Sequence, residues 1–210
     1  MPSFIRNTSG GTAVSGGALA PRSRRGNTNQ ADDYWRGGVV ADTNAYESIA
    51  SLTVDATADL TVTFSSIPAT YKHLQIRAIA LSASDSYPVL LRLNSDTGSN
   101  YSYHYLAAQG SVVNSGVGTS QTSIITAGNN ARFLNPTNPW AFVIDILDYA
   151  DTNKYKTARV LHGTDYNGSG EVNLTSGNWR NTAAVSTITM SMASSGFTQY
   201  SSFALYGIKG

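Results

Sequence analysis

The 210-residue sequence contains no cysteine, which excludes disulfide bonds, thiolate metal sites and a cysteine nucleophile. Charge is also scarce: Asp, Glu, Lys and Arg make up 13% of the chain, against about 25% in typical soluble domains. Serine, threonine, asparagine, glycine and tyrosine take the place of charged residues. This composition is typical of β-rich proteins that belong to particles or work outside cells, and it argues against a soluble cytosolic enzyme.

The sequence also lacks long apolar runs and the common catalytic motifs. No run approaches the ~18 residues of a membrane-spanning helix, so no membrane partner is expected. There is no HExxH, GxSxG, P-loop or GxGxxG pattern. The three histidines stand alone in separate segments: His73, His104 and His162. We therefore predict no catalytic residues, no metal site and no cofactor, and we expect that the protein is not an enzyme.

Two groups of acidic and amide side chains are better explained by a structural role than by catalysis or metal binding. Asp145 and Asp148 are three residues apart on an expected strand, so they face opposite sides and suit glycosidase chemistry poorly. Asp148 is expected to form the following turn. Asn94, Asp96 and Asn100 offer oxygen ligands for Ca²⁺, but their loop lacks the carboxylates of a dedicated site. Side chains that stabilise their own turns are the favoured reading.

Residues 1–44 differ from the rest of the chain. They contain three Gly-Gly pairs and show neither helical nor strand periodicity. Such a segment buries too little apolar surface to offset its ordering entropy. We predict an extended N-terminal arm that runs across neighbouring subunits of an assembly. Its expected partner-binding residues are Arg6, Arg22, Arg24, Arg25, Tyr34, Trp35 and Arg36.

The charge of the arm is too small to indicate a nucleic-acid binder. Its five arginines face three aspartates, whereas nucleic-acid binding depends on many phosphate contacts. Arg22, Arg24 and Arg25 can contact phosphate, but acidic patches on a partner, or simple solvation of the arm, are favoured. Tyr34 and Trp35 are either an interface anchor or part of the packing of their own domain.

Residues 45–210 show the alternation of half-buried strands. About ten strands with turn signals between them predict an all-β domain, a β-sandwich or jelly roll. Residues 89–93 and 101–107 are expected to form a hairpin, and 110–118 a flexible loop. The expected strands are 46–54, 60–64, 73–81, 89–93, 101–107, 121–127, 140–147, 155–161, 171–174, 185–192 and 203–208.

Tyr101, Tyr103 and Tyr105 alternate along one expected strand and therefore share a face. Such a stripe is a candidate binding surface, because tyrosine gives large contact area at low entropy cost. It suits stacking on sugar rings, a subunit interface or the covering of a core. The sequence leaves these three alternatives open.

Two segments resemble a pattern of tailed-phage virion proteins. They are Phe64–Arg77, with the phrase IPATYKHLQIR, and Leu90–His104, with LRLNSDTGSNY. The ending ALYGIK at 204–209 is also similar. The resemblance covers roughly residues 46–104 and the last few residues; the arm and the middle of the chain do not share it. It brings no catalytic residues with it.

The resemblance implies a non-enzymatic virion protein assembled in the host cytoplasm. We expect the sandwich to decorate or cement the capsid, with the arm holding it to its neighbours. The major capsid protein is the expected partner, and the copies are expected to be symmetric, first as a homotrimer. The alternative is a tail-fibre, baseplate or head-fibre module for host attachment, with tail proteins as partners and the tyrosine stripe or loops as its binding surface.

Overall fold

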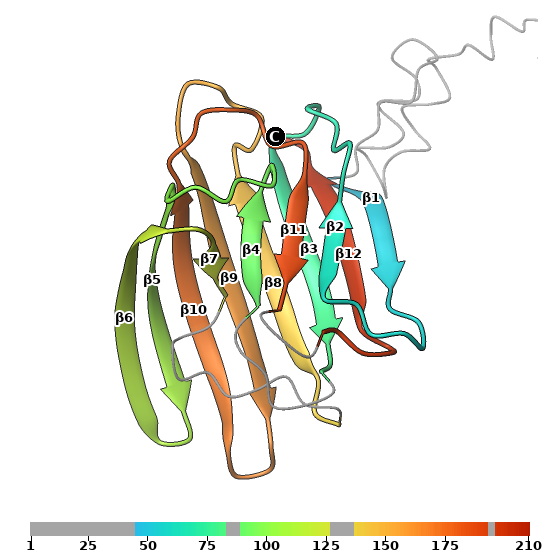
Figure 1. Cartoon of the computed structure of the whole chain (residues 1–210), viewed down its shortest axis with the longest axis vertical. Coiled ribbons are helices and arrows are strands. Elements are labelled where there is room, and N and C mark those ends of the chain that lie inside the picture. Colours follow the sequence, from blue (N-terminus) through green and yellow to red (C-terminus); the bar gives the residue numbers. More distant parts are fainter. Residues whose placement is uncertain (1–44, 83–88, 127–136, 193–195) are drawn as a thin grey trace, which may run out of the picture. The chain divides into compact units, whose positions relative to one another are not determined.

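The computed structural model describes residues 45–82, 89–126, 137–192 and 196–210. They form an all-β domain of twelve strands in two antiparallel sheets (Figure 1). The large sheet has the order β1-β12-β3-β8-β9-β10-β5-β6 and the small sheet β2-β11-β4-β7. The strands are β1 (Tyr46–Thr53), β2 (Thr61–Phe64), β3 (His73–Ala80), β4 (Leu90–Leu93), β5 (Tyr101–Gln109), β6 (Val112–Gln121), β7 (Ile124–Ile125), β8 (Trp140–Leu147), β9 (Lys156–Asp165), β10 (Gly170–Trp179), β11 (Ile188–Ser191) and β12 (Ser202–Ile208).

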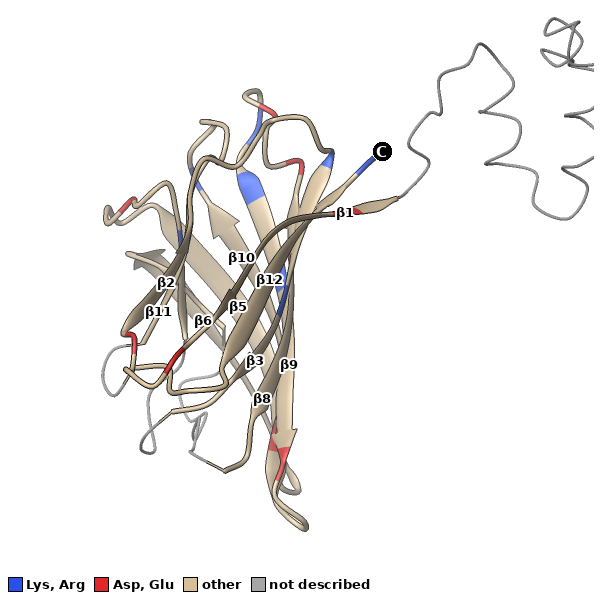
Figure 2. Ribbon diagram, turned by 90° about the vertical axis from the view of Figure 1, so that its right-hand side faces the viewer, with Lys and Arg blue, Asp and Glu red and all other residues tan. Residues whose placement is uncertain are grey.

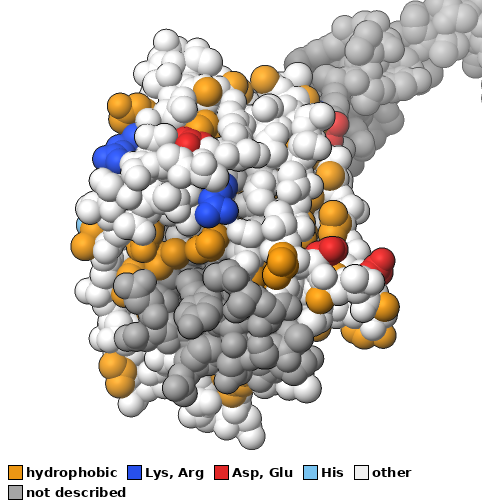
Figure 3. All heavy atoms as spheres, in the orientation of Figure 1, with side chains coloured by type: hydrophobic (Ala, Val, Ile, Leu, Met, Phe, Trp, Pro, Cys, Tyr) orange, Lys and Arg blue, Asp and Glu red, His pale blue; other side chains and the backbone are white. Residues whose placement is uncertain are grey.

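The two sheets pack face to face, with the small sheet over part of the large one (Figures 1 and 2). Charged residues lie mainly in loops and near strand ends in the described part of the chain (Figure 2). Seen from the small-sheet side, the surface is mostly polar and uncharged, with a few isolated charged side chains (Figure 3). The described residues contain no helix that is long and apolar enough to cross a membrane.

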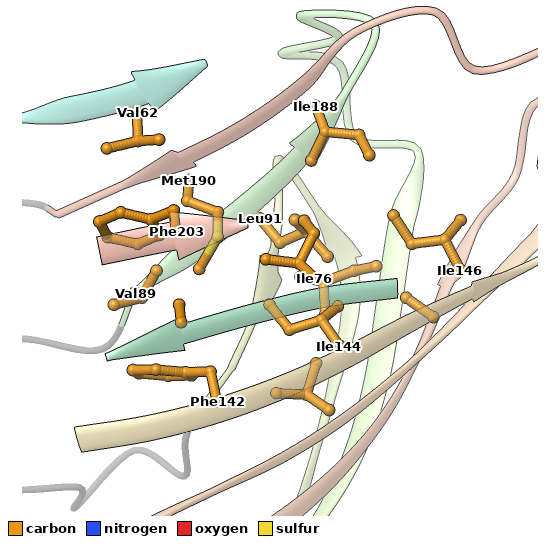
Figure 4. Close-up of a cluster of buried hydrophobic side chains, with 14 of the residues drawn as sticks. Val62, Ile76, Val89, Leu91, Phe142, Ile144, Ile146, Ile188, Met190 and Phe203 are labelled. Carbon is orange, nitrogen blue, oxygen red and sulfur yellow. The ribbon is translucent and has the colours of Figure 1, made fainter. Parts of the chain in front are cut away.

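One hydrophobic core fills the space between the sheets. Leu91, Ile188 and Met190 of the small sheet meet Ile76 and Ile144 of the large sheet (Figure 4). Strict alternation supplies these residues: in β8, every second side chain from Trp140 to Ile146 is buried. Each fully buried aliphatic side chain contributes about 1.5–3 kcal/mol relative to its exposed state. The predicted β-sandwich is thereby confirmed, with twelve strands in place of about ten.

Residues 112–121 form an edge strand, β6, and the predicted loop at 110–118 is wrong. The glycines that suggested a loop serve the pairing with β5. A Cβ on Gly118 would lie 2.3 Å from the Tyr103 ring, and one on Gly116 would lie 2.5 Å from the Tyr105 hydroxyl. The tyrosine rings therefore lie over the glycines of the neighbouring strand, which larger residues would prevent.

The predicted hairpin between residues 89–93 and 101–107 is also wrong. β4 pairs with β11 and β7 in the small sheet, whereas β5 pairs with β10 and β6 in the large sheet. The loop between them therefore crosses from one sheet to the other. Turn-rich composition predicted the loop itself but not the sheet to which each flanking strand belongs.

Candidate functional site

The tyrosine stripe faces the core, which corrects its reading as a binding surface. Tyr101 is 0% exposed and Tyr103 is 6% exposed, and Tyr105 is partly buried against the same core. Burial raises the pKa of the Tyr101 hydroxyl to about 12. That hydroxyl accepts a hydrogen bond from Leu93 N at 3.0 Å and lies 3.2 Å from the Leu93 carbonyl oxygen. The stripe ties β5 to the small sheet and offers little area to a ligand.

The predicted arm residues lie outside the described part of the chain: Arg6, Arg22, Arg24, Arg25, Tyr34, Trp35 and Arg36.

Two of the three segments that carry the phage resemblance, Phe64–Arg77 and 204–209, meet in a joint around Tyr71. A Cβ on Gly207, in the ALYGIK ending, would lie 2.3 Å from Cγ of Tyr71. The Tyr71 ring therefore packs directly on the backbone of β12. The Tyr149 hydroxyl donates a hydrogen bond to the Pro68 carbonyl and accepts one from Tyr71 N at 3.3 Å. The turn before β3 is thus fastened to both β12 and the end of β8.

A second joint is built by the loop at residues 94–100. Asp96 accepts hydrogen bonds from Trp179 Nε1 at 2.7 Å, Asn100 Nδ2 at 2.9 Å and Gly98 N at 2.8 Å. The Trp179 hydrogen bond is the main cause that lowers the Asp96 pKa, with Asn100 and Gly98 adding to it. The Asn94 side chain donates to the Ala184 carbonyl at 2.8 Å. These contacts fit the turn-stabilising reading, and no group of three His, Asp or Glu residues in the described chain can hold a metal ion.

Asp148 forms a small ion cluster at the end of β8. Its carboxylate contacts Lys72 at 2.8 Å and also accepts from Lys154. Hydrogen bonds from Lys154 and Lys72 lower the pKa of Asp148 to about 2. Asp145 instead accepts a hydrogen bond from Nε2 of the buried Gln75 at 2.7 Å. Asp148 lies in the turn after β8, as expected from the sequence, and the two carboxylates serve separate polar contacts.

Lys156 is a buried lysine that joins two loops. Its side chain is 0% exposed, and its ammonium group donates to the carbonyls of Asp151, Lys154 at 2.9 Å and Thr182 at 3.0 Å. Three donors meet three acceptors, which uses the full capacity of the group. Burial lowers the Lys156 pKa. This contact could not be predicted from the sequence, because nothing in the spacing separates this lysine from a surface one.

The inner face of the large sheet also carries a buried polar group of His162, Glu171 and Asn173. The His162 ring lies beside Trp140 and Phe142, with centroids 4.8 and 5.2 Å away. Within the described structure, both His162 ring nitrogens, one Glu171 carboxylate oxygen and the Asn173 amide nitrogen make no hydrogen bond of normal geometry.

Burial shifts the pKa values of the two titratable groups of this cluster, His162 and Glu171, in opposite directions. It lowers the pKa of His162 to about 3, an effect that the backbone of Thr126 only partly opposes. It raises the pKa of Glu171 to about 7, against a smaller opposing effect of Asn173. Both residues are therefore neutral in the folded protein at mildly acid pH.

Opposite pH dependences follow for two variants. Because His162 stays neutral in the folded protein, the protein loses stability as the pH falls below 6.5. The unfolded chain then binds a proton at His162 that the folded chain does not. Because Glu171 stays protonated in the folded protein, the protein loses stability as the pH rises above 4.5. The unfolded chain then releases the Glu171 proton that the folded chain still holds. Between pH 4.5 and 6.5, the free energy of unfolding of His162→Phe should rise relative to that of the wild type as the pH falls. That of Glu171→Gln should rise relative to the wild type as the pH increases. Each difference should change by up to about 1.4 kcal/mol per pH unit.

Urea unfolding of the three proteins across this range measures the two slopes. Equal, pH-independent differences for both variants would contradict the burial account. Opposite slopes would confirm it.

The face of the large sheet turned away from the small sheet, hereafter the outer face, carries an unusual row of apolar side chains. Across β8, β9, β10 and β5 the register aligns Val143, Leu161, Leu174 and Leu106. The three leucines are each slightly more than half exposed. The next row holds Ile79, Ala141, Gly163, Val172, Ala108 and Val113.

The outward side of the small sheet provides a contrast. Its exposed positions include Thr61 and Thr63 of β2, with Thr189 and Arg92 half-buried beside them. An antiparallel sheet with one solvated face normally shows this polar pattern. The apolar rows of the outer face depart from it, and contiguous exposed apolar surface of this kind marks an interaction site. The outer face is therefore the candidate functional site of the described chain.

No family model and no curated protein matches the sequence. One solved structure with some likeness is a protein of unknown function from Shewanella oneidensis MR-1, at 7% sequence identity and a TM-score of 0.20. The likeness covers 78% of this chain and 75% of that one. At this level it carries no argument about fold or function.

Proposed function

We propose that this chain is a non-enzymatic structural protein of a tailed-phage virion. In this proposal the β-sandwich decorates or cements the capsid, residues 1–44 hold it to neighbouring subunits, and the major capsid protein is its partner. One observation carries the proposal: several residues of the segments that resemble phage virion proteins make contacts that join parts of the sandwich.

Three contacts make this point. Tyr71 of the first similar segment packs on Gly207 of the last one. Asp96 of the second segment binds the Trp179 indole. Tyr101, at the end of that segment, bonds to the backbone of β4. The resemblance therefore lies in a scaffold, which is the part that structural virion proteins would be expected to share.

The tail-fibre alternative depended partly on an exposed tyrosine stripe. Because Tyr101 and Tyr103 are core residues, that alternative keeps only the loops as a binding surface, and we favour the capsid role. The sparse charge of the chain, at 13% Asp, Glu, Lys and Arg, also suits a particle protein.

Deleting residues 1–38 tests the division of labour between arm and body. We expect the truncated protein to keep its β-sheet circular dichroism signal and to lose its binding to virions that lack the native protein. Co-sedimentation with such particles measures the binding, and the full chain is the control. A truncated protein that still binds at full occupancy, or one that no longer folds, would refute the proposal that the arm alone anchors the body.

A further inference from the structure

The outer face has a symmetry of its own, centred between β9 and β10. Leu161 and Leu174 lie directly opposite each other across this midline. One strand further out, Val143 of β8 and Leu106 of β5 occupy equivalent places. The left and right halves of the apolar row therefore carry like side chains at equal distances from the midline.

The neighbouring rows follow the same symmetry at some of their positions. In one, Ala141 is the counterpart of Ala108, and Ile79 is the counterpart of Val113. The other row is mostly polar: Asp145 is the counterpart of His104, Arg159 that of Ser176 and Gln75 that of Val117. A two-fold axis parallel to the strands over the midline would place each residue on its counterpart in a second copy. In the two apolar rows the side chains of Leu161, Val143 and Ile79 would then meet those of Leu174, Leu106 and Val113, and the Asp145 carboxylate would meet the His104 imidazole.

The relief of the face also fits such a pairing. A shallow groove of about 410 Å³ lies at the β3 side, and Ile79, Ala141 and Val143 contribute to its lining. At the β6 side, the Val113 residue is 68% exposed. Because β3 and β6 are equally far from the midline, the two-fold axis places Val113 of one copy over the groove of the other.

We propose that two copies of this chain pair through their outer faces about this axis. The contact is isologous, because each half of the face meets the other half of the same face. Sheets pack in this way about 10 Å apart, with their strands roughly aligned. This pairing depends only on the outer face, so it is independent of the proposed virion role.

The size of the face predicts a reversible dimer. Six strands about 4.8 Å apart and three rows about 6.8 Å apart give a footprint of roughly 600 Å² per copy. Standard stable interfaces bury about 800 Å² per partner. The pair should therefore dissociate on dilution. It is a symmetric homo-oligomer, as expected from the sequence, but a dimer and not the homotrimer expected first.

Sedimentation velocity of the full chain over a wide concentration range tests the pairing. We expect a monomer–dimer equilibrium in the wild type and a monomer for Leu174→Glu at every concentration. The matched control is Leu60→Glu, because Leu60 is similarly exposed, at 59% against 52%, and precedes β2 of the other sheet. It should dimerise like the wild type. A monomeric or trimeric wild type, or a Leu174→Glu dimer as stable as the control, would overturn the proposal.

Introduced cysteines test the axis itself, since the chain has none of its own. Val143→Cys and Leu106→Cys in one chain lie three strands apart, roughly 14 Å, too far for an internal disulfide. Across the proposed axis they face each other. Mild oxidation should give a covalent dimer of the double variant and none when Leu60→Cys replaces Leu106→Cys. A double variant that stays uncrosslinked would reject the axis.

Discussion

Replacing Lys156 by alanine should lower the free energy of unfolding by about 2–4 kcal/mol. The ammonium group is the common donor to the carbonyls of Asp151, Lys154 and Thr182. Removing it leaves partly buried acceptors unsatisfied, at about 1–3 kcal/mol for each fully buried group. The aliphatic stem also leaves a space in a region where the side chain is 0% exposed.

Two further variants make this prediction specific, all measured by urea unfolding. Lys154→Ala removes a lysine that is 51% exposed, so its effect should be much smaller. Lys156→Met keeps most of the stem and removes the donors, so it should fall between Lys156→Ala and the wild type. If Lys156→Ala proves no more destabilising than Lys154→Ala, the buried lysine does not hold the two loops together.

Gly207→Ala should destabilise the sandwich by about 1–3 kcal/mol, the usual range for overpacking. The new Cβ would lie 2.3–2.4 Å from three atoms of the Tyr71 ring. The ring would have to move, which would disturb the turn that Tyr149 fastens to Pro68 and Tyr71. The φ angle of Gly207 is not in the left-handed region, so the effect is one of space and not of backbone strain.

A double-mutant cycle isolates this contact. Tyr71→Ala removes the ring, so adding Gly207→Ala to it should destabilise far less than Gly207→Ala does alone. We expect a coupling of about 1–2 kcal/mol, within the range for residues in direct contact. Strictly additive effects would show that the two similar segments do not support each other through this pair.

The sequence predicted the elements better than their partners. Alternation placed β8 at residues 140–147 without error and β3 within one residue, because both strands pack one strictly apolar face on the core. Alternation failed at β6, because Gly116 and Gly118 leave room for the rings of Tyr105 and Tyr103 on the neighbouring strand and so interrupt the pattern. It also failed to separate β4 from β5, since a turn-rich loop looks the same whether it closes a hairpin or crosses between sheets.

The candidate site was harder to predict for a related reason. Alternation shows that Tyr101, Tyr103 and Tyr105 share a face, but not which face is buried. The signal for the outer face was present in the segment 73–81, where Ile79 and Leu81 leave the second face only partly polar. Its meaning depended on the register of six strands, which brings Leu106, Leu161 and Leu174 into one row.

A cryo-EM map of the intact virion tests most directly whether the protein works on the capsid. The described sandwich is large enough to be docked in such a map. We expect its density to repeat over the capsid shell, with extended density from residues 1–44 running between neighbouring capsid subunits. Density confined to the tail or to a single vertex, or no density for this chain in the particle, would contradict the capsid role.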